Sequence, residues 1–113
     1  MNCSITTSSA FDKAFKALAK RYPSLRTDLV SFVEEIRENP TMGTQLGHNL
    51  RKVRFAISSK GKGKSGGARV ITHTVLFTTD GADVTLLTIY DKSEQLSVSD
   101  KELKKLLKDN NLE

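Results

Sequence analysis

The chain has 113 residues, 37% of them hydrophobic and 27% charged, which is typical of one globular domain over residues 1–113 and excludes a disordered or fibrous protein. Its formal net charge of +5 favours an acidic partner, and its single cysteine, Cys3, excludes an internal disulfide and a cysteine-rich metal site. No apolar run approaches the ~20 residues that cross a bilayer, and the first residues lack the basic start and apolar block of a signal peptide, so we expect a cytoplasmic protein with no membrane segment.

Two helices are predicted in the first forty residues. The first begins with an N-cap at Ser9, and its apolar residues recur at helical spacing up to Tyr22. Pro23 ends it, because a proline inside a helix loses a hydrogen bond and clashes with the preceding turn. Ser24 then caps a second amphipathic helix that stops at Asn39-Pro40. Almost no linker separates the two helices, so we expect an αα-hairpin.

After residue 50 the apolar residues recur at every second position, which predicts strands. The first strand covers residues 52–57, and the second covers residues 68–77. A tight turn at Asp80-Gly81 leads to a third strand over residues 84–90, which is apolar on both faces and therefore expected to be central. Ser99 begins a capping box for a last helix with a stripe of leucines. With an edge strand in residues 1–8, the expected fold class is α+β in the order (β)ααβββα.

The positive charge is concentrated in the middle of the chain. Residues 40–79 carry seven Lys and Arg and no Asp or Glu, whereas the two flanks together have a net charge of −2. Crowded cations repel one another and destabilise a small domain unless a polyanion binds there, and the phosphate backbone of a nucleic acid is the usual polyanion. A solvated loop and an acidic protein partner are the alternatives. The seven cations are Arg51, Lys52, Arg54, Lys60, Lys62, Lys64 and Arg69.

Residues 58–67, with the sequence SSKGKGKSGG, include a Gly-Lys-Ser of the kind found in nucleotide-binding loops. Such a loop also needs a glycine where Ser58 stands and a helix directly after it, whereas here a strand is predicted. We therefore exclude an ATPase. We expect a flexible basic turn between two strands, in which the glycines let lysines spread over an extended anion.

Residues 61–71, GKGKSGGARVI, resemble a motif of the RelE/HigB-like branch of the RelE/ParE toxin superfamily. The similarity covers roughly residues 11–108 in the family's order. Its other matching segments are Tyr22-Pro23-Ser24-Leu25, Asn39-Pro40, Gly43, Leu46-Gly47, Lys52-Val53-Arg54, the stretch LLTIYDK at 86–92 and Glu102-Leu103.

The resemblance implies the toxin of a type II toxin–antitoxin pair. It implies an α+β fold in which the αα-hairpin packs on a small, mostly antiparallel twisted sheet that also carries a C-terminal helix. Members of this branch typically cut mRNA in the ribosomal A site without a metal or cofactor, and an antitoxin encoded next to the toxin neutralises it.

Metal-free RNA cleavage uses the 2′-hydroxyl of the substrate to attack the adjacent phosphate, and it needs a base, an acid and cations. Arg69 matches the arginine that the family places on the scissile phosphate, where a bidentate guanidinium suits the geometry. Lys52 and Arg54 share one face of their strand and would line the same groove. Tyr90 and Lys92 are the best candidates for acid and base, and nearby cations are expected to lower the pKa of both.

The remaining polar residues are given lesser roles. Lys60, Lys62 and Lys64, together with Arg51, are predicted to bind ribosomal RNA, because a glycine-rich loop is too mobile to hold a catalytic group. His73 has the strand parity of Ile71 and is expected to be a packed residue of the core or edge. We assign no role to His48, and Asp91 is left out of the site because it alternates to the other face of its strand.

Two other functions stay open. Relatives in the superfamily include poisons of DNA gyrase, and a nucleic-acid-binding protein without catalysis would also fit the charge. The cationic strand and loop favour the ribonuclease. An antitoxin that covers these cations should carry an acidic segment that lies across the basic groove or displaces the terminal helix, and its binding should weaken with salt.

Overall fold

The structure of the chain is a computed structural model that describes residues 2–78 and 80–112. Within these residues the fold is α+β, as expected. Its elements follow one another in the order β1 (Asn2–Thr7), α1 (Ser9–Ala19), α2 (Leu25–Glu38), β2 (Thr44–Gly47), β3 (Leu50–Phe55), the short 3-10 turn η1 (Ser58–Lys60), β4 (Ala68–Thr78), β5 (Gly81–Asp91) and α3 (Asp100–Asp109).

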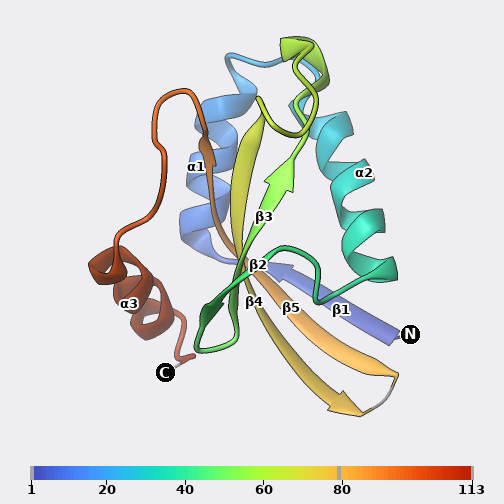
Figure 1. The fold of residues 1–113 in the computed structure, drawn as a ribbon, viewed down its shortest axis with the longest axis vertical. Helices are drawn as coiled ribbons and strands as arrows, with labels where there is room; N and C mark the ends of the chain where they lie inside the picture. The colour runs from blue at the N-terminus through green and yellow to red at the C-terminus, as the bar shows by residue number, and fades with distance from the viewer. Residues whose placement is uncertain (1, 79, 113) are drawn as a thin grey trace.

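The described strands form one sheet in the order β1-β5-β4-β3-β2 (Figure 1). β1 is the predicted edge strand and runs parallel to β5, and every other pair is antiparallel. The prediction that β5 is central is confirmed. The expected order is wrong in one respect, because it lacks β2. This strand has four residues, all exposed, and therefore no alternation of apolar and polar positions.

The helix boundaries follow from local chemistry, with three corrections. α1 ends at Ala19, before Tyr22 and Pro23, and the Ser24 hydroxyl makes no capping hydrogen bond to α2. The N-cap of α1 is Ser8 and not Ser9: the Ser8 hydroxyl accepts a hydrogen bond from Phe11 N–H at 3.0 Å and donates one to the Leu87 carbonyl at 2.7 Å. A cap that also bonds to the sheet satisfies two groups at once, which favours Ser8. Ser99 caps α3 as predicted, accepting from Glu102 N–H at 3.2 Å.

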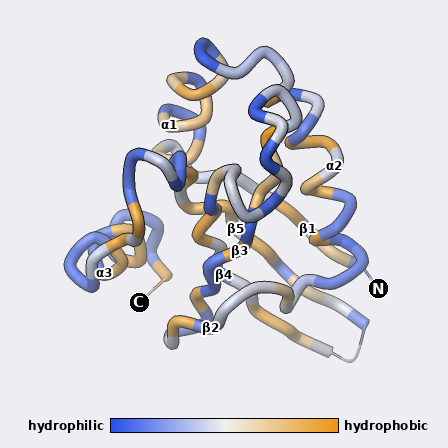
Figure 2. The backbone as a smooth tube through the Cα atoms, turned by 45° about the horizontal axis from the view of Figure 1, so that its top comes forward, coloured by the Kyte–Doolittle hydropathy of each residue, from blue (hydrophilic) through white to orange (hydrophobic). Residues whose placement is uncertain are grey.

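Helices cover both faces of the sheet. On one face, which we call the hairpin face, α1 and α2 bury a cluster that includes Phe11, Phe32 and Phe55. On the other, the α3 face, Leu103 and Leu107 pack on Leu50, Ile71, Leu87 and Tyr90. Most residues of α3 are hydrophilic (Figure 2), and its lysines are exposed. None of the helices in residues 2–78 and 80–112 has the length and hydropathy that crossing a bilayer requires.

Candidate functional site

Three adjacent strands bring Arg54, Arg69 and Tyr90 into one row on the α3 face. The ladder sets Arg54 of β3 opposite Arg69 of β4, and Arg69 opposite Tyr90 of β5. Directly opposed residues point to the same face of a sheet, with their Cβ atoms about 4.5–5.5 Å apart. Three residues that are 15 or more positions apart in the sequence are thus neighbours, and we call them the Arg54–Arg69–Tyr90 row.

Lys52 extends this row along β3. It lies two residues before Arg54, on the same face, and is paired with Ile71 of β4. It is half-buried and lines a small cavity of about 120 Å³ beside α3, together with Val98 and Leu103. The expected pairing of Lys52 and Arg54 on one face is therefore present in the structure.

Arg69 is 6% exposed and binds the main chain of the glycine-rich loop. Its Nη1 donates to the carbonyls of Lys64 and Ala68, both at 3.0 Å, and its Nη2 donates to the carbonyl of Ser65 at 3.3 Å. Burial lowers the pKa of Arg69, and the nearby Arg54 lowers it further. Among the described residues, these three bonds leave two of the five N–H donors of the guanidinium, including Nε–H, without a partner.

Tyr90 is buried, and its hydroxyl has no hydrogen-bond partner in the described structure. The prediction that cations lower its pKa is wrong: burial raises the pKa of Tyr90, and the opposing effect of Arg69 is smaller. Glu102 of α3 raises it further. Desolvation outweighs the cations because α3 covers this ring, which the sequence pattern did not indicate.

Lys92 lies where β5 ends and joins the same loop. Its N–H donates to the Gly67 carbonyl at 3.2 Å, and its Nζ donates to the Ser65 carbonyl at 3.1 Å. Because Arg69 also donates to Ser65, the two cations share one acceptor and lie close together. The structure thus gathers the predicted catalytic residues Lys52, Arg54, Arg69, Tyr90 and Lys92 in and beside the row.

The glycine-rich loop differs from the open fan of lysines that we expected. Lys60 Nζ is 2.7 Å from the carboxylate of Asp91, and its side chain is only 11% exposed. Lys64 Nζ is 2.5 Å from the carboxylate of Glu35. Among the described residues no acid pairs with Lys62, which is exposed. Only one of the three lysines is therefore free to dock on an anion without breaking an ion pair.

Arg51 lies on the opposite face from the row. Its ladder partner is Thr72, which is opposite Leu86 in the hairpin-face cluster. Arg51 Nη1 donates to the Thr41 carbonyl at 2.9 Å. The alternation of side chains along β3 explains this position, and it separates Arg51 from the cations with which the sequence analysis grouped it.

Asp91 is the centre of a network that the sequence analysis missed. Its buried carboxylate accepts hydrogen bonds from Tyr22 Oη at 2.5 Å, Arg21 Nη2 at 3.0 Å and Lys60 Nζ at 2.7 Å, and also from Ser93. Burial alone would raise the pKa of Asp91, but these bonds outweigh it and hold the pKa well below its usual range. Strand parity correctly predicted that Asp91 lies on the face opposite Tyr90, which is the hairpin face. Its distant partners left no local signal.

A second buried carboxylate, Asp28 of α2, holds the other end of η1. It accepts from the Ser58 hydroxyl at 2.5 Å, from Ser58 N–H at 3.0 Å and from the Ser24 hydroxyl at 2.7 Å. Ser24 in turn accepts from Ser59 N–H at 2.8 Å. The base of the glycine-rich loop is thus fixed between α2 and β5, so it presents Arg69 and Lys92 in a defined geometry.

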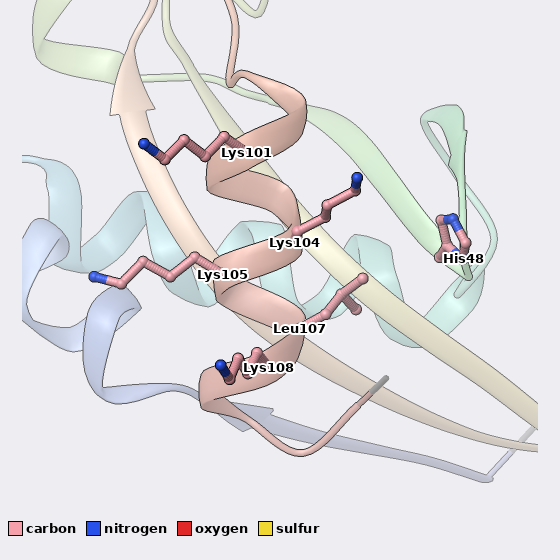
Figure 3. A pocket seen from close by; sticks show the side chains of 6 residues that line it. All are labelled: His48, Lys101, Lys104, Lys105, Leu107 and Lys108. Carbon is pink, nitrogen blue, oxygen red and sulfur yellow. The ribbon is translucent and has the colours of Figure 1, made fainter.

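The two histidines have different surroundings. His73 is buried, as expected for a packed residue, and burial lowers its pKa. His48 lines a groove of about 590 Å³ next to α3 (Figure 3). The other lining residues are Leu107 and the four lysines Lys101, Lys104, Lys105 and Lys108. Helical spacing explains this second cationic surface, which the sequence analysis did not single out.

In residues 2–78 and 80–112, no three side chains of His, Cys, Asp or Glu come together in a way that could hold a metal ion. No protein-family model matches the chain.

Proposed function

We propose that the chain is a RelE/HigB-like toxin of a type II toxin–antitoxin pair that cuts mRNA on the ribosome. The reaction is the metal-independent attack of a substrate 2′-hydroxyl on the adjacent phosphate. The observation that carries this proposal is the Arg54–Arg69–Tyr90 row, flanked by Lys52 and Lys92. An αα-hairpin on one face of a mostly antiparallel sheet, with a terminal helix on the other, is compatible with the RelE-like fold.

The cations of the row suit a phosphate that gains charge in the transition state. Within the described residues no carboxylate pairs with Lys52, Arg54 or Arg69, so their charge is available to a substrate. Arg69 keeps two N–H donors for phosphate oxygens while its other donors fix it to the loop. Preorganised donors of this kind stabilise developing charge without reorganising during the reaction.

Tyr90 fits the acid better than the base. Its raised pKa keeps the phenol protonated at neutral pH, so the hydroxyl can donate to the leaving 5′-oxygen or to a phosphate oxygen. The unpaired hydroxyl lies beside Arg69, where the phosphate would bind. In the described structure nothing accepts its hydrogen bond, but the hydroxyl is buried beside α3, so a substrate would reach this donor only when α3 moves aside.

The other cations support binding of the ribosome and of the antitoxin. Lys62 is the loop lysine best placed to contact ribosomal RNA, because it is exposed and has no acidic partner in the described structure. An antitoxin with an acidic segment would neutralise the toxin by covering the same positive charge.

The test is a translating extract that receives the purified protein and one defined mRNA, with the new 5′ ends mapped. The same mRNA without ribosomes is the control. We expect cuts only in the presence of ribosomes and in register with codons. Cuts without ribosomes would indicate a free ribonuclease. No cuts by a folded protein would overturn the proposal, and a gyrase-cleavage assay and an RNA-binding assay would then separate the two alternative functions.

A further inference from the structure

One edge of β4 is open where the strand extends past β3. The last residue pair between these strands joins Leu50 to His73, and Thr74 N–H donates to the Asn49 carbonyl at 3.0 Å. Beyond that bond, no strand of the described chain pairs with this side of β4, although β4 continues beside β5 (Figure 1). Because main-chain groups two residues apart point the same way, Leu76 directs its N–H and C=O to this open side.

The open edge is apolar and uncharged. Val75, Leu76 and Phe77 are 37%, 54% and 60% exposed. β4 carries no Lys, Asp or Glu, and its only arginine, Arg69, lies at the far end of the strand. Natural proteins usually protect an exposed edge with charges, prolines or a covering loop, and an edge without them is a template for another strand.

A cation lies beside this edge. A cavity of about 290 Å³ is lined by Arg51, Thr74, Val75 and Leu76, together with Thr41 and Asn49. Arg51 donates to the Thr41 carbonyl, its Nε is buried without an acceptor, and no carboxylate in the described structure pairs with it. Ladder partners place Arg51 and Leu76 on the same hairpin face of the sheet.

We infer that this edge binds an extended segment of a partner protein, which adds a strand beside β4 and places an Asp or Glu side chain near Arg51. Main-chain bonds to Leu76 provide the pairing, and apolar side chains on the same face of the segment cover Leu76. Charge complementarity selects an acidic segment over a second copy of this chain, because β4 itself contains no carboxylate to offer Arg51. The site is independent of the proposed ribonuclease, since it lies at the other end of β4 from Arg69.

The experiment uses the full chain labelled with ¹⁵N and two capped peptides, Val-Thr-Glu-Thr-Val-Thr and the same sequence with Lys in place of Glu. We expect the Glu peptide to shift the amide signals of residues 74–77, to slow hydrogen exchange at Leu76 and to bind at least tenfold more tightly than the Lys peptide. Arg51→Glu should reverse this preference. Arg26→Glu changes the net charge equally on an exposed part of α2 and should leave the preference unchanged.

A second probe does not depend on the folding of the Arg51 variant. The Glu peptide with N-methyl groups on alternate amides cannot pair with a strand edge, and it should lose binding to the unmodified protein. Equal binding of the Glu and Lys peptides, binding that survives N-methylation, or signal shifts confined to α3 would overturn the inference. Protection of Leu76 that grows with protein concentration, without peptide, would assign the edge to a second copy instead.

Discussion

Tyr90 buries a hydroxyl that has no hydrogen-bond partner in the described structure. A buried hydroxyl without a partner lowers the free energy of unfolding by about 1–3 kcal/mol, and a phenylalanine at this position would avoid that cost. We therefore expect Tyr90→Phe to raise the free energy of unfolding by about 1 kcal/mol while lowering mRNA cleavage about 10- to 100-fold. Urea unfolding at pH 7 and the translating extract measure the two effects. A variant that is less stable, or fully active, would contradict the role proposed for Tyr90.

The same residue gives an alkaline pH dependence. The pKa of Tyr90 is raised in the folded state above its ordinary value of 10.0, so its contribution to stability is complete below that pH and is lost as the pH rises through the folded pKa. The wild type should therefore lose more stability than Tyr90→Phe between about pH 9.5 and 11. If both proteins lose the same free energy of unfolding across this range, the result would argue against the burial of this phenol.

Arg69 is predicted to be the residue that cleavage needs most. Arg69→Ala should reduce the cleavage rate about 10²–10³-fold, as for the loss of one preorganised charge donor. Arg69→Lys should restore little activity, because a lysine keeps the charge but not the bidentate geometry. Rates are measured at a temperature where the variants stay folded, with Arg26→Ala on exposed α2 as the matched control. Cleavage that is unchanged in Arg69→Ala would remove the proposed site.

Asp91 stabilises the fold through charged hydrogen bonds. Replacement by Asn removes the charge that Lys60 and Arg21 face, and it should lower the free energy of unfolding by about 2–4 kcal/mol. The pKa of Asp91 is held well below its usual range, so this stabilisation is present above about pH 4 and lost as the pH falls. Urea unfolding at neutral and acid pH measures the free energy of unfolding of both proteins. The difference between wild type and Asp91→Asn should be smaller in acid. Asp12→Asn, at an exposed position of α1, is the control and should have little effect at either pH.

At the scale of elements, the glycine-rich loop is fixed at its base and charged at its tip. Lys60 belongs to the base and Lys62 to the tip, although the two lysines are only two residues apart. We expect Lys60→Ala to destabilise the protein by about 1–3 kcal/mol, because it removes a buried partner of Asp91. Lys62→Ala should leave stability unchanged. It should also reduce the slope of log affinity for ribosomes against log salt by about one, as for the loss of one phosphate contact. Thermal unfolding and salt titrations distinguish the two. Equal effects of both substitutions on stability would contradict this division of the loop.

α3 is the element with the fewest specific ties to the rest of the molecule. Within the described residues no hydrogen bond or salt bridge joins it to the sheet, so its attachment depends on Leu103, Leu107 and their apolar neighbours. Each fully buried leucine contributes about 1.5–3 kcal/mol. If the proposed function holds, an acidic, amphipathic antitoxin segment would have both the charge and the apolar surface to compete for this position beside the lysine groove (Figure 3).

At the scale of the whole molecule, the fold converts an uneven charge distribution along the chain into separate surfaces. The row gathers cations on one part of the α3 face, and the lysines of α3 line a groove on another. Lys60 and Lys64 of the loop instead pair with acids on the hairpin side of the sheet. Binding to ribosomes should therefore weaken more than tenfold between about 100 and 300 mM KCl, because several phosphate contacts release counterions. Sedimentation of the protein with ribosomes over this range measures the effect. An affinity that does not change with salt would contradict binding through these cations.

The sequence by itself determined the features that depend on near neighbours. Helical spacing, caps and proline stops placed all three α-helices, and the period of two placed β3, β4 and β5 and assigned Tyr90 and Asp91 to opposite faces. Side-chain alternation is a local property, so a single strand is enough to show it. The grouping of Lys52 with Arg54 followed from the same rule.

Only the tertiary structure decided the features that depend on distant groups. β2 has no buried side of its own and forms by pairing with β3, so its residues show no pattern. Arg69 and Tyr90 are neighbours because two strands are in register, and burial under α3 sets the direction of the Tyr90 pKa. Lys60 pairs with Asp91 because α1, η1 and the end of β5 meet in space. Desolvation and ion pairing act through distance in space, which the order of residues does not record.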